Sequence, residues 1–187
     1  LSLLDYAVNT TLVISNTAIH KDDKAGILTF NEKIGSFVKA NKKPGQLKRI
    51  SEILYKEEES NLEANYELLF NAVSRFIKQR SLIILYTNFE SYYTLERYLP
   101  VLRKINRSHL LLVVVFKNTE IEKYSYEIAL NTLDIYHKTI GKKFLFEKEM
   151  MVKELAKYGI QSILTAPQDL STLTINKYLE FKAKGWI

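Results

Sequence analysis

The sequence contains no cysteine, only six glycines and three prolines. The lack of cysteine excludes disulfides and thiolate metal sites, and it leaves no indication of the redox compartment. The glycines lie far apart, so neither the P-loop nor the dinucleotide-binding fingerprint is present. No apolar run approaches the roughly 18 residues that a membrane-spanning helix requires, and the first residues do not have the layout of a signal peptide. We therefore expect no membrane segment within these 187 residues.

The composition is that of a folded protein. Apolar residues make up 47% of the chain and include 12 Tyr and 9 Phe, which is enough for a core and excludes a disordered chain. The net charge is +6, from 27 basic and 21 acidic side chains. The basic residues are scattered, with only short clusters at 39–43 and 140–144. This distribution favours a generally basic surface, and we expect no nucleic-acid site.

The chain begins with Leu1 rather than methionine, in sequence that is already periodically apolar. We therefore expect a fragment of a longer protein.

The apolar spacing predicts helices that alternate with single strands. Such alternation is typical of a parallel sheet covered by helices on both faces, with crossovers between strands. We predict one three-layer α/β domain over residues 1–187, with a mostly parallel sheet and one antiparallel edge strand at 36–41. The predicted helices are 1–20, 46–58, 62–79, 92–106, 119–157 and 173–185, and the other predicted strands are 25–30, 82–87, 109–116 and 161–167.

Three local features are predicted within these helices. Asn61 is a suitable cap for the helix that starts at Leu62, since its side chain can accept from free backbone N–H groups. Pro100 predicts a kink or an early end of its helix, because proline lacks the N–H donor. Gly141 is the expected point of interruption in the long helical stretch 119–157.

No set of residues in the sequence has the pattern of an active site. His20, His109 and His137 each lack a second histidine at metal-binding spacing, and His109 is expected to be structural. A G-x-S-x-G elbow is absent, which gives no support to serine-based acyl transfer. The carboxylates at 56–60 and at Asp22 and Asp23 are expected to be solvated surface groups.

The segment LIILYTNFES, residues 82–91, is where we expect a site. A buried strand ends there at Thr87, followed by Asn88 and Glu90. In open α/β sheets, ligands bind beyond the carboxyl ends of the strands. Two interpretations of Asn88 stay open: it caps the following helix, or its amide oxygen faces a ligand.

The order of elements resembles the von Willebrand factor A-like domain, and within it the bacterial family catalogued as domain of unknown function 58. Asp23, Gly26, Leu28 and Phe30 match a strand that reads D-x-x-G-L-l-x-F in that family. The resemblance covers nearly the whole chain in pattern. The segments that carry it are DKAGILTFNEKI, EESNLEAN and SLIILYTNFES.

The resemblance implies a site at the carboxyl end of the sheet where two aspartates, hydroxyls and waters hold Mg²⁺. This chain departs from that pattern: Ser60 and Asn61 stand where the family has Thr-Asp, and Thr87 and Asn88 stand where it has Ser-Asp. The family's Asp-x-Ser-x-Ser strand does not occur. Neutral oxygens hold Mg²⁺ weakly, so we predict a degenerate site with no metal and only uncharged oxygens at this rim.

The missing strand lies at the centre of the sheet in the family. Its absence leaves the strands at 25–30 and 82–87 to pair with each other, to pair with another copy, or to keep free edges. We therefore expect dimerisation or strand swapping by this chain.

The resemblance implies a non-enzymatic protein–protein interaction domain that binds through Ser60, Asn61, Thr87, Asn88 and Glu90. The implied partner is a MoxR-type AAA ATPase, and the implied parent protein is anchored in a membrane with this domain in the cytoplasm. One alternative is an enzyme on a Rossmann- or flavodoxin-like sheet whose catalytic motif lies outside these residues. A second alternative is nucleic-acid binding through the basic surface, which would show a steep dependence on salt.

Overall fold

The computed structural model describes residues 2–59, 63–129 and 131–187. The chain divides into two compact units, one formed by Leu1–Ser81 with Gln168–Ile187 and the other by Leu82–Pro167. Each unit is described by itself below. The expectation of a single domain stays a prediction.

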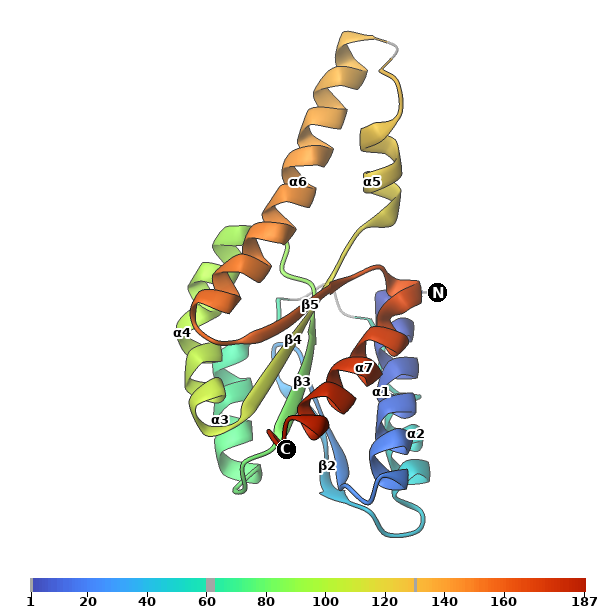
Figure 1. The fold of residues 1–187 in the computed structure, drawn as a ribbon, viewed down its shortest axis with the longest axis vertical. Coiled ribbons are helices and arrows are strands. Elements are labelled where there is room, and N and C mark those ends of the chain that lie inside the picture. The colour runs from blue at the N-terminus through green and yellow to red at the C-terminus, as the bar shows by residue number, and fades with distance from the viewer. Residues whose placement is uncertain (1, 60–62, 130) are drawn as a thin grey trace. The chain divides into compact units, whose positions relative to one another are not determined.

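The first unit contains an antiparallel strand pair and four helices (Figure 1). The predicted hairpin is confirmed, since β1 and β2 pair antiparallel with Ile27 opposite Val38. The elements are α1 (Leu3–His20), β1 (Ala25–Phe30), β2 (Ile34–Asn41), α2 (Gln46–Leu54), α3 (Tyr66–Phe76) and α7 (Leu170–Ala183).

Helix α1 forms although its middle is rich in β-branched residues. At its start, Ser2 accepts a hydrogen bond from the Asp5 backbone, and the Asp5 carboxylate accepts one from the Ser2 backbone, which makes a capping box. Thr11 and Thr17 donate their hydroxyls to carbonyls one turn earlier, so their polar groups are satisfied within the helix. The helix predicted at 1–20 is therefore confirmed.

The core of the first unit lies between the strand pair and its helices. Ile27 and Val38 from the strands pack with Ile50 and Leu54 of α2, and α1 closes the cluster with partly buried apolar residues. Gly26 allows the two strands to approach, because a Cβ there would lie 2.5 Å from the Val38 carbonyl oxygen.

The second unit contains a three-stranded parallel sheet in the order β3-β4-β5. Every residue of the central strand β4 is buried, as its unbroken apolar run predicts. Its elements are β3 (Leu82–Thr87), α4 (Tyr92–Ser108), β4 (Leu110–Phe116), α5 (Thr119–Tyr126), α6 (Thr132–Lys157) and β5 (Gln161–Thr165), and a turn of 3-10 helix, η1 (Pro167–Asp169), follows.

The predicted α/β fold class is confirmed by the parallel sheet, the antiparallel pair and the seven α-helices of the described residues. The antiparallel strand β2 is paired with β1 in a sheet of its own. Among the described strands, β1 pairs only with β2 and β3 pairs only with β4.

Three local predictions differ from the structure. Asn65 caps α3 by accepting from the backbone of residues 67 and 68, whereas Asn61 lies outside the described residues. Pro100 lies inside α4, so the predicted early end is wrong, while the alternative of a kink stays a prediction. The carbonyl that loses its donor belongs to Glu96, and both residues are exposed to water.

The long helical stretch is interrupted elsewhere than predicted. Gly141 lies within α6, whereas α5 ends at Tyr126 and α6 begins at Thr132. Gly141 has a packing role instead: a Cβ there would lie 2.3 Å from the Ser125 hydroxyl oxygen of α5. The absence of a side chain thus lets α5 and α6 pack closely, as a two-helix hairpin that extends beyond the carboxyl edge of the sheet in this unit (Figure 1).

No helix in residues 2–59, 63–129 and 131–187 has the length and apolar character needed to cross a bilayer.

Candidate functional site at the carboxyl end of β3

Side chains are alternately buried and exposed over residues 87–90, at the end of β3 and in the turn that follows it. Thr87 is buried at the end of the strand, opposite Val115 of β4. Asn88 is exposed, Phe89 is 2% exposed, and Glu90 is exposed again. The buried Phe89 anchors this turn in the core, so Asn88 and Glu90 are presented at the edge of the sheet.

Asn88 does not cap the next helix. The N-cap of α4 is Ser91, whose hydroxyl oxygen accepts from the Thr94 backbone at 3.3 Å. The interpretation of Asn88 as a helix cap is therefore wrong. Asn88 precedes the N-cap by three residues, and Ser91 has the extended backbone that a cap requires.

The amide of Asn88 instead meets a buried cation from the same chain. The ammonium group of Lys148, from the middle of α6, donates a hydrogen bond to Asn88 Oδ1 at 3.0 Å and another to the Phe89 carbonyl oxygen. It also lies 5.0 Å from the centre of the Phe144 ring. The residue is only 1% exposed. A buried charge of this kind is tolerated because it is hydrogen-bonded.

Burial lowers the pKa of Lys148 from its ordinary 10.5 to about 8, while the negative charges of Glu147 and Glu90 act to raise it. Two carboxylates therefore lie close enough to this ammonium group to affect it. The prediction of a rim with only uncharged oxygens is wrong. The rim has both a cation and acidic groups. Lys148 and Glu147 come from α6, and Glu90 comes from the turn after β3.

These contacts do not fit a divalent cation. Two of the oxygens that could serve as ligands, Asn88 Oδ1 and the Phe89 carbonyl, already accept from Lys148. A dication next to a buried ammonium group would be repelled, and Mg²⁺ gives up its water reluctantly. The described residues contain no group of three or more histidine, aspartate or glutamate side chains placed to hold a metal.

Of the five predicted site residues, the structure brings Thr87, Asn88 and Glu90 together at the end of β3. Ser60 and Asn61 lie outside the described residues. Sequence reasoning missed Lys148, although a signal existed. The buried positions of α6 include Gly141, Leu145, Lys148 and Met151, so a lysine interrupts an apolar stripe of helical spacing.

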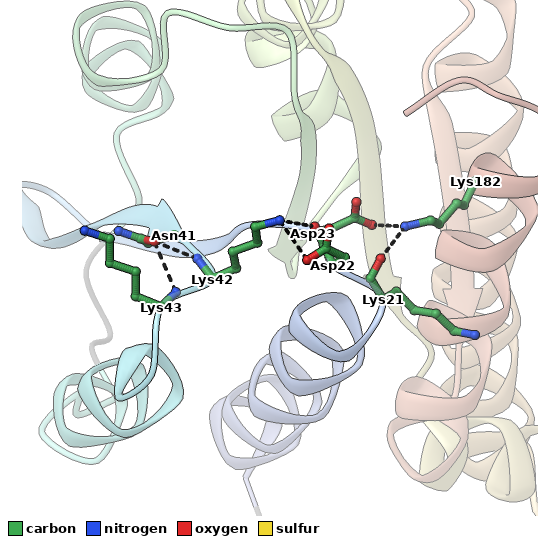
Figure 2. Close-up of polar contacts among 7 residues, drawn as sticks. All are labelled: Lys21, Asp22, Asp23, Asn41, Lys42, Lys43 and Lys182. Carbon is green, nitrogen blue, oxygen red and sulfur yellow. Dashed lines mark hydrogen bonds and ion pairs between the residues drawn. The ribbon is translucent and has the colours of Figure 1, made fainter.

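Asp22 and Asp23, expected to be solvated, are paired with lysines of the first unit (Figure 2). Asp22 binds Lys42 at 2.7 Å. Asp23 accepts from Lys182 at 2.6 Å and from the Tyr178 hydroxyl, which joins the start of β1 to α7. Asp22 therefore lies in a surface ion pair, whereas Asp23 connects two elements of the unit. Both carboxylates are therefore engaged with side chains of the first unit.

The structural role expected for His109 stays a prediction. It is 6% exposed at the start of β4, and burial lowers its pKa. Its Nδ1 has no hydrogen-bond partner in the part of the chain that the structure describes.

Comparisons with protein family models, with curated proteins and with solved structures find no match for this chain.

Proposed function

We propose that this chain is a non-enzymatic protein-interaction domain that binds its partner at the β3 rim, defined as Thr87, Asn88, Glu90 and Lys148, without a divalent metal. The observation that supports this is the pair of hydrogen bonds from the Lys148 ammonium to Asn88 Oδ1 and the Phe89 carbonyl. This ammonium holds in place the turn that follows β3. In the family that the sequence resembles, a metal ion does so.

The exposed part of this rim can contact a partner. Asn88 and Glu90 are exposed, and both are close to the rigid end of a strand in the parallel sheet. Lys148 itself is enclosed, so its role is to position Asn88 and to offset the charge of Glu90. A partner would therefore meet an amide and a carboxylate. The partner suggested by the resemblance is a MoxR-type AAA ATPase.

Isothermal titration calorimetry tests the metal part of the proposal. Addition of Mg²⁺ or Mn²⁺ to the chain should give no binding in the micromolar range, because the nearby oxygens are used by Lys148. Micromolar binding by the wild-type chain would contradict the proposal. Light scattering on the same samples tests the separate prediction of dimers.

Binding to the purified ATPase tests the partner. Affinity should be unaffected by a chelator and should fall about tenfold in Glu90→Lys, since reversal of a charge at a contact is unfavourable. Glu52→Lys is the matched control, because Glu52 is exposed on α2 and undergoes the same change of charge. An equal loss of affinity in Glu90→Lys and Glu52→Lys would show that the partner does not bind at the β3 rim.

The alternative of an enzyme would use the same lysine, because a pKa of about 8 leaves part of the amine unprotonated near neutral pH. Its enclosure argues against this, since a substrate could not reach Nζ without movement of α6. Reduction with borohydride in the presence of propanal, followed by mass spectrometry, distinguishes the two. Modification of Lys148 faster than that of exposed lysines would favour the enzyme.

A further inference from the structure

The far end of the α5–α6 hairpin exposes large apolar side chains. A single exposed apolar residue is ordinary, but contiguous exposed apolar surface marks an interaction site. Ile128, in the connection between the helices, is 87% exposed. The apolar tip is defined here as Ile128, Leu133 (64% exposed), Ile135 (56%) and Tyr136 (63%).

The apolar tip is supported by polar contacts around the buried Lys138. Lys138 of α6 is buried and donates to the carbonyl oxygens of Glu127 and Ile128, at 2.9 Å each. These carbonyls follow the C-terminus of α5, where a positive charge is favourable. Asp134 lies 3.4 Å from the same ammonium and accepts from the Tyr124 hydroxyl. The backbone that carries the exposed side chain of Ile128 is therefore held in place by Lys138.

The apolar tip presents these side chains on every side that α5 leaves open. Successive residues of a helix are about 100° apart, so Leu133 and Ile135 lie on opposite flanks of α6, with Tyr136 between them on the outer face. The inner face is filled by Lys138 and Gly141, which are buried against α5. A groove on a protein covers one side of a helix. A bilayer surrounds an inserted tip on all sides.

The charges of the hairpin suit an anionic surface. Lys142 and Lys143 are exposed on α6. They lie about 10 Å behind Tyr136 along the helix axis, at 1.5 Å per residue. Of the acidic groups nearby, Asp134 is engaged by Lys138, Glu147 lies 4.0 Å from the Lys143 ammonium, and Glu127 is exposed. Apolar side chains of surface-bound helices reach about 5–10 Å below the headgroups, which would bring these two lysines to the level of the phosphates.

We propose that the α5–α6 hairpin inserts its apolar tip into the interfacial region of a lipid bilayer with anionic headgroups, while Lys142 and Lys143 contact the phosphates. Tyr136 fits this position, because its ring is apolar and its hydroxyl remains at the wet interface. Tyr126, whose ring lies 5.7 Å from the Lys142 ammonium, would lie beside that lysine at the level of the headgroups. This activity is separate from partner binding at the β3 rim. It requires no membrane-spanning helix, since only the end of the hairpin enters the lipid.

Vesicle co-sedimentation of the full chain tests this proposal. Vesicles of equimolar phosphatidylglycerol and phosphatidylcholine should bind the chain, and vesicles of phosphatidylcholine alone should bind it more weakly. The double variant Ile128→Ser, Leu133→Ser should lose at least tenfold in partitioning, because each buried aliphatic side chain contributes about tenfold or more. The double variant Lys142→Glu, Lys143→Glu should lose binding to the anionic vesicles at low salt.

Tyr55→Ser is the matched control, since Tyr55 is 78% exposed at the end of α2, in the other unit. It should bind vesicles as the wild type does. Circular dichroism should show unchanged helix content in all variants, because the replaced side chains are exposed. The proposal is overturned if neither vesicle type binds, or if the Ile128 and Leu133 changes have no effect. It is also overturned if they abolish a dimer seen by light scattering while vesicles bind neither form, which would assign the apolar tip to a second copy.

Discussion

The buried ammonium group of Lys148 makes the free energy of unfolding depend on pH in the alkaline range. Burial lowers its pKa from 10.5 to about 8 in the folded chain, against the opposing effect of Glu147 and Glu90. The unfolded chain exposes the side chain and restores the ordinary pKa. Between these two values the unfolded chain keeps a proton that the folded chain has released. Stability therefore rises with pH across this window.

The size of the effect follows from the two pKa values. The difference between 10.5 and about 8 is about 2.5, and each pKa unit corresponds to about 1.36 kcal/mol. The full gain is therefore about 3 kcal/mol. Most of it, about 2.5 kcal/mol, should appear between about pH 7 and about pH 10. Below the folded pKa both states carry the proton, so the contribution is constant there.

Urea unfolding of the wild type and of Lys148→Met, measured over this pH range, isolates the contribution. Methionine keeps the apolar stem and cannot bind a proton, and subtraction of the two curves removes the titration of the many tyrosines and other lysines. The stability of the wild type relative to Lys148→Met should increase by about 2.5 kcal/mol from about pH 7 to about pH 10. Lys143→Met is the control, since the Lys143 side chain is 75% exposed on the same helix, and it should follow the wild type. A difference between wild type and Lys148→Met that stays flat with pH would refute the reasoning.

Three further predictions concern packing and charge elsewhere. Gly141→Ala should lower the free energy of unfolding by about 1–3 kcal/mol, because the new Cβ would lie 2.3 Å from the Ser125 hydroxyl oxygen; Ser125→Ala should recover part of this loss in urea unfolding. Asp23→Asn should cost about 1–2 kcal/mol by thermal unfolding, because the acceptor for Tyr178 loses its charge. Although burial raises the pKa of Asp23, its hydrogen bonds lower it overall, so this stabilisation should be present above pH 3.8 and lost as the pH falls further. The wild type should lose stability as the pH falls below 6.5, because burial lowers the pKa of His109 in the folded chain. His109→Leu should lack this loss in urea unfolding, and equal acid sensitivity of the two proteins would contradict the prediction.

The secondary structure was largely predictable because its causes are local. The run of apolar residues in β4 and the helical spacing in α1 record which side of each element is buried, and burial is what stabilises these elements. The predicted position of the α5–α6 break was wrong for a related reason. Gly141 has low helix propensity, but its close contact with Ser125 depends on a second helix, and this contact favours glycine within α6.

The alternation of strands and helices by itself determined the α/β class and the sheet edge at which Thr87, Asn88 and Glu90 lie, because parallel strands present their carboxyl ends at one edge of a sheet. The charge of that edge was decided only by the tertiary structure. Lys148 follows Asn88 by 60 residues, and its ammonium reaches the amide because α6 packs beside α4 in the same unit. Local periodicity reports which residues are buried, whereas the partner of a buried charge depends on which distant element lies against it.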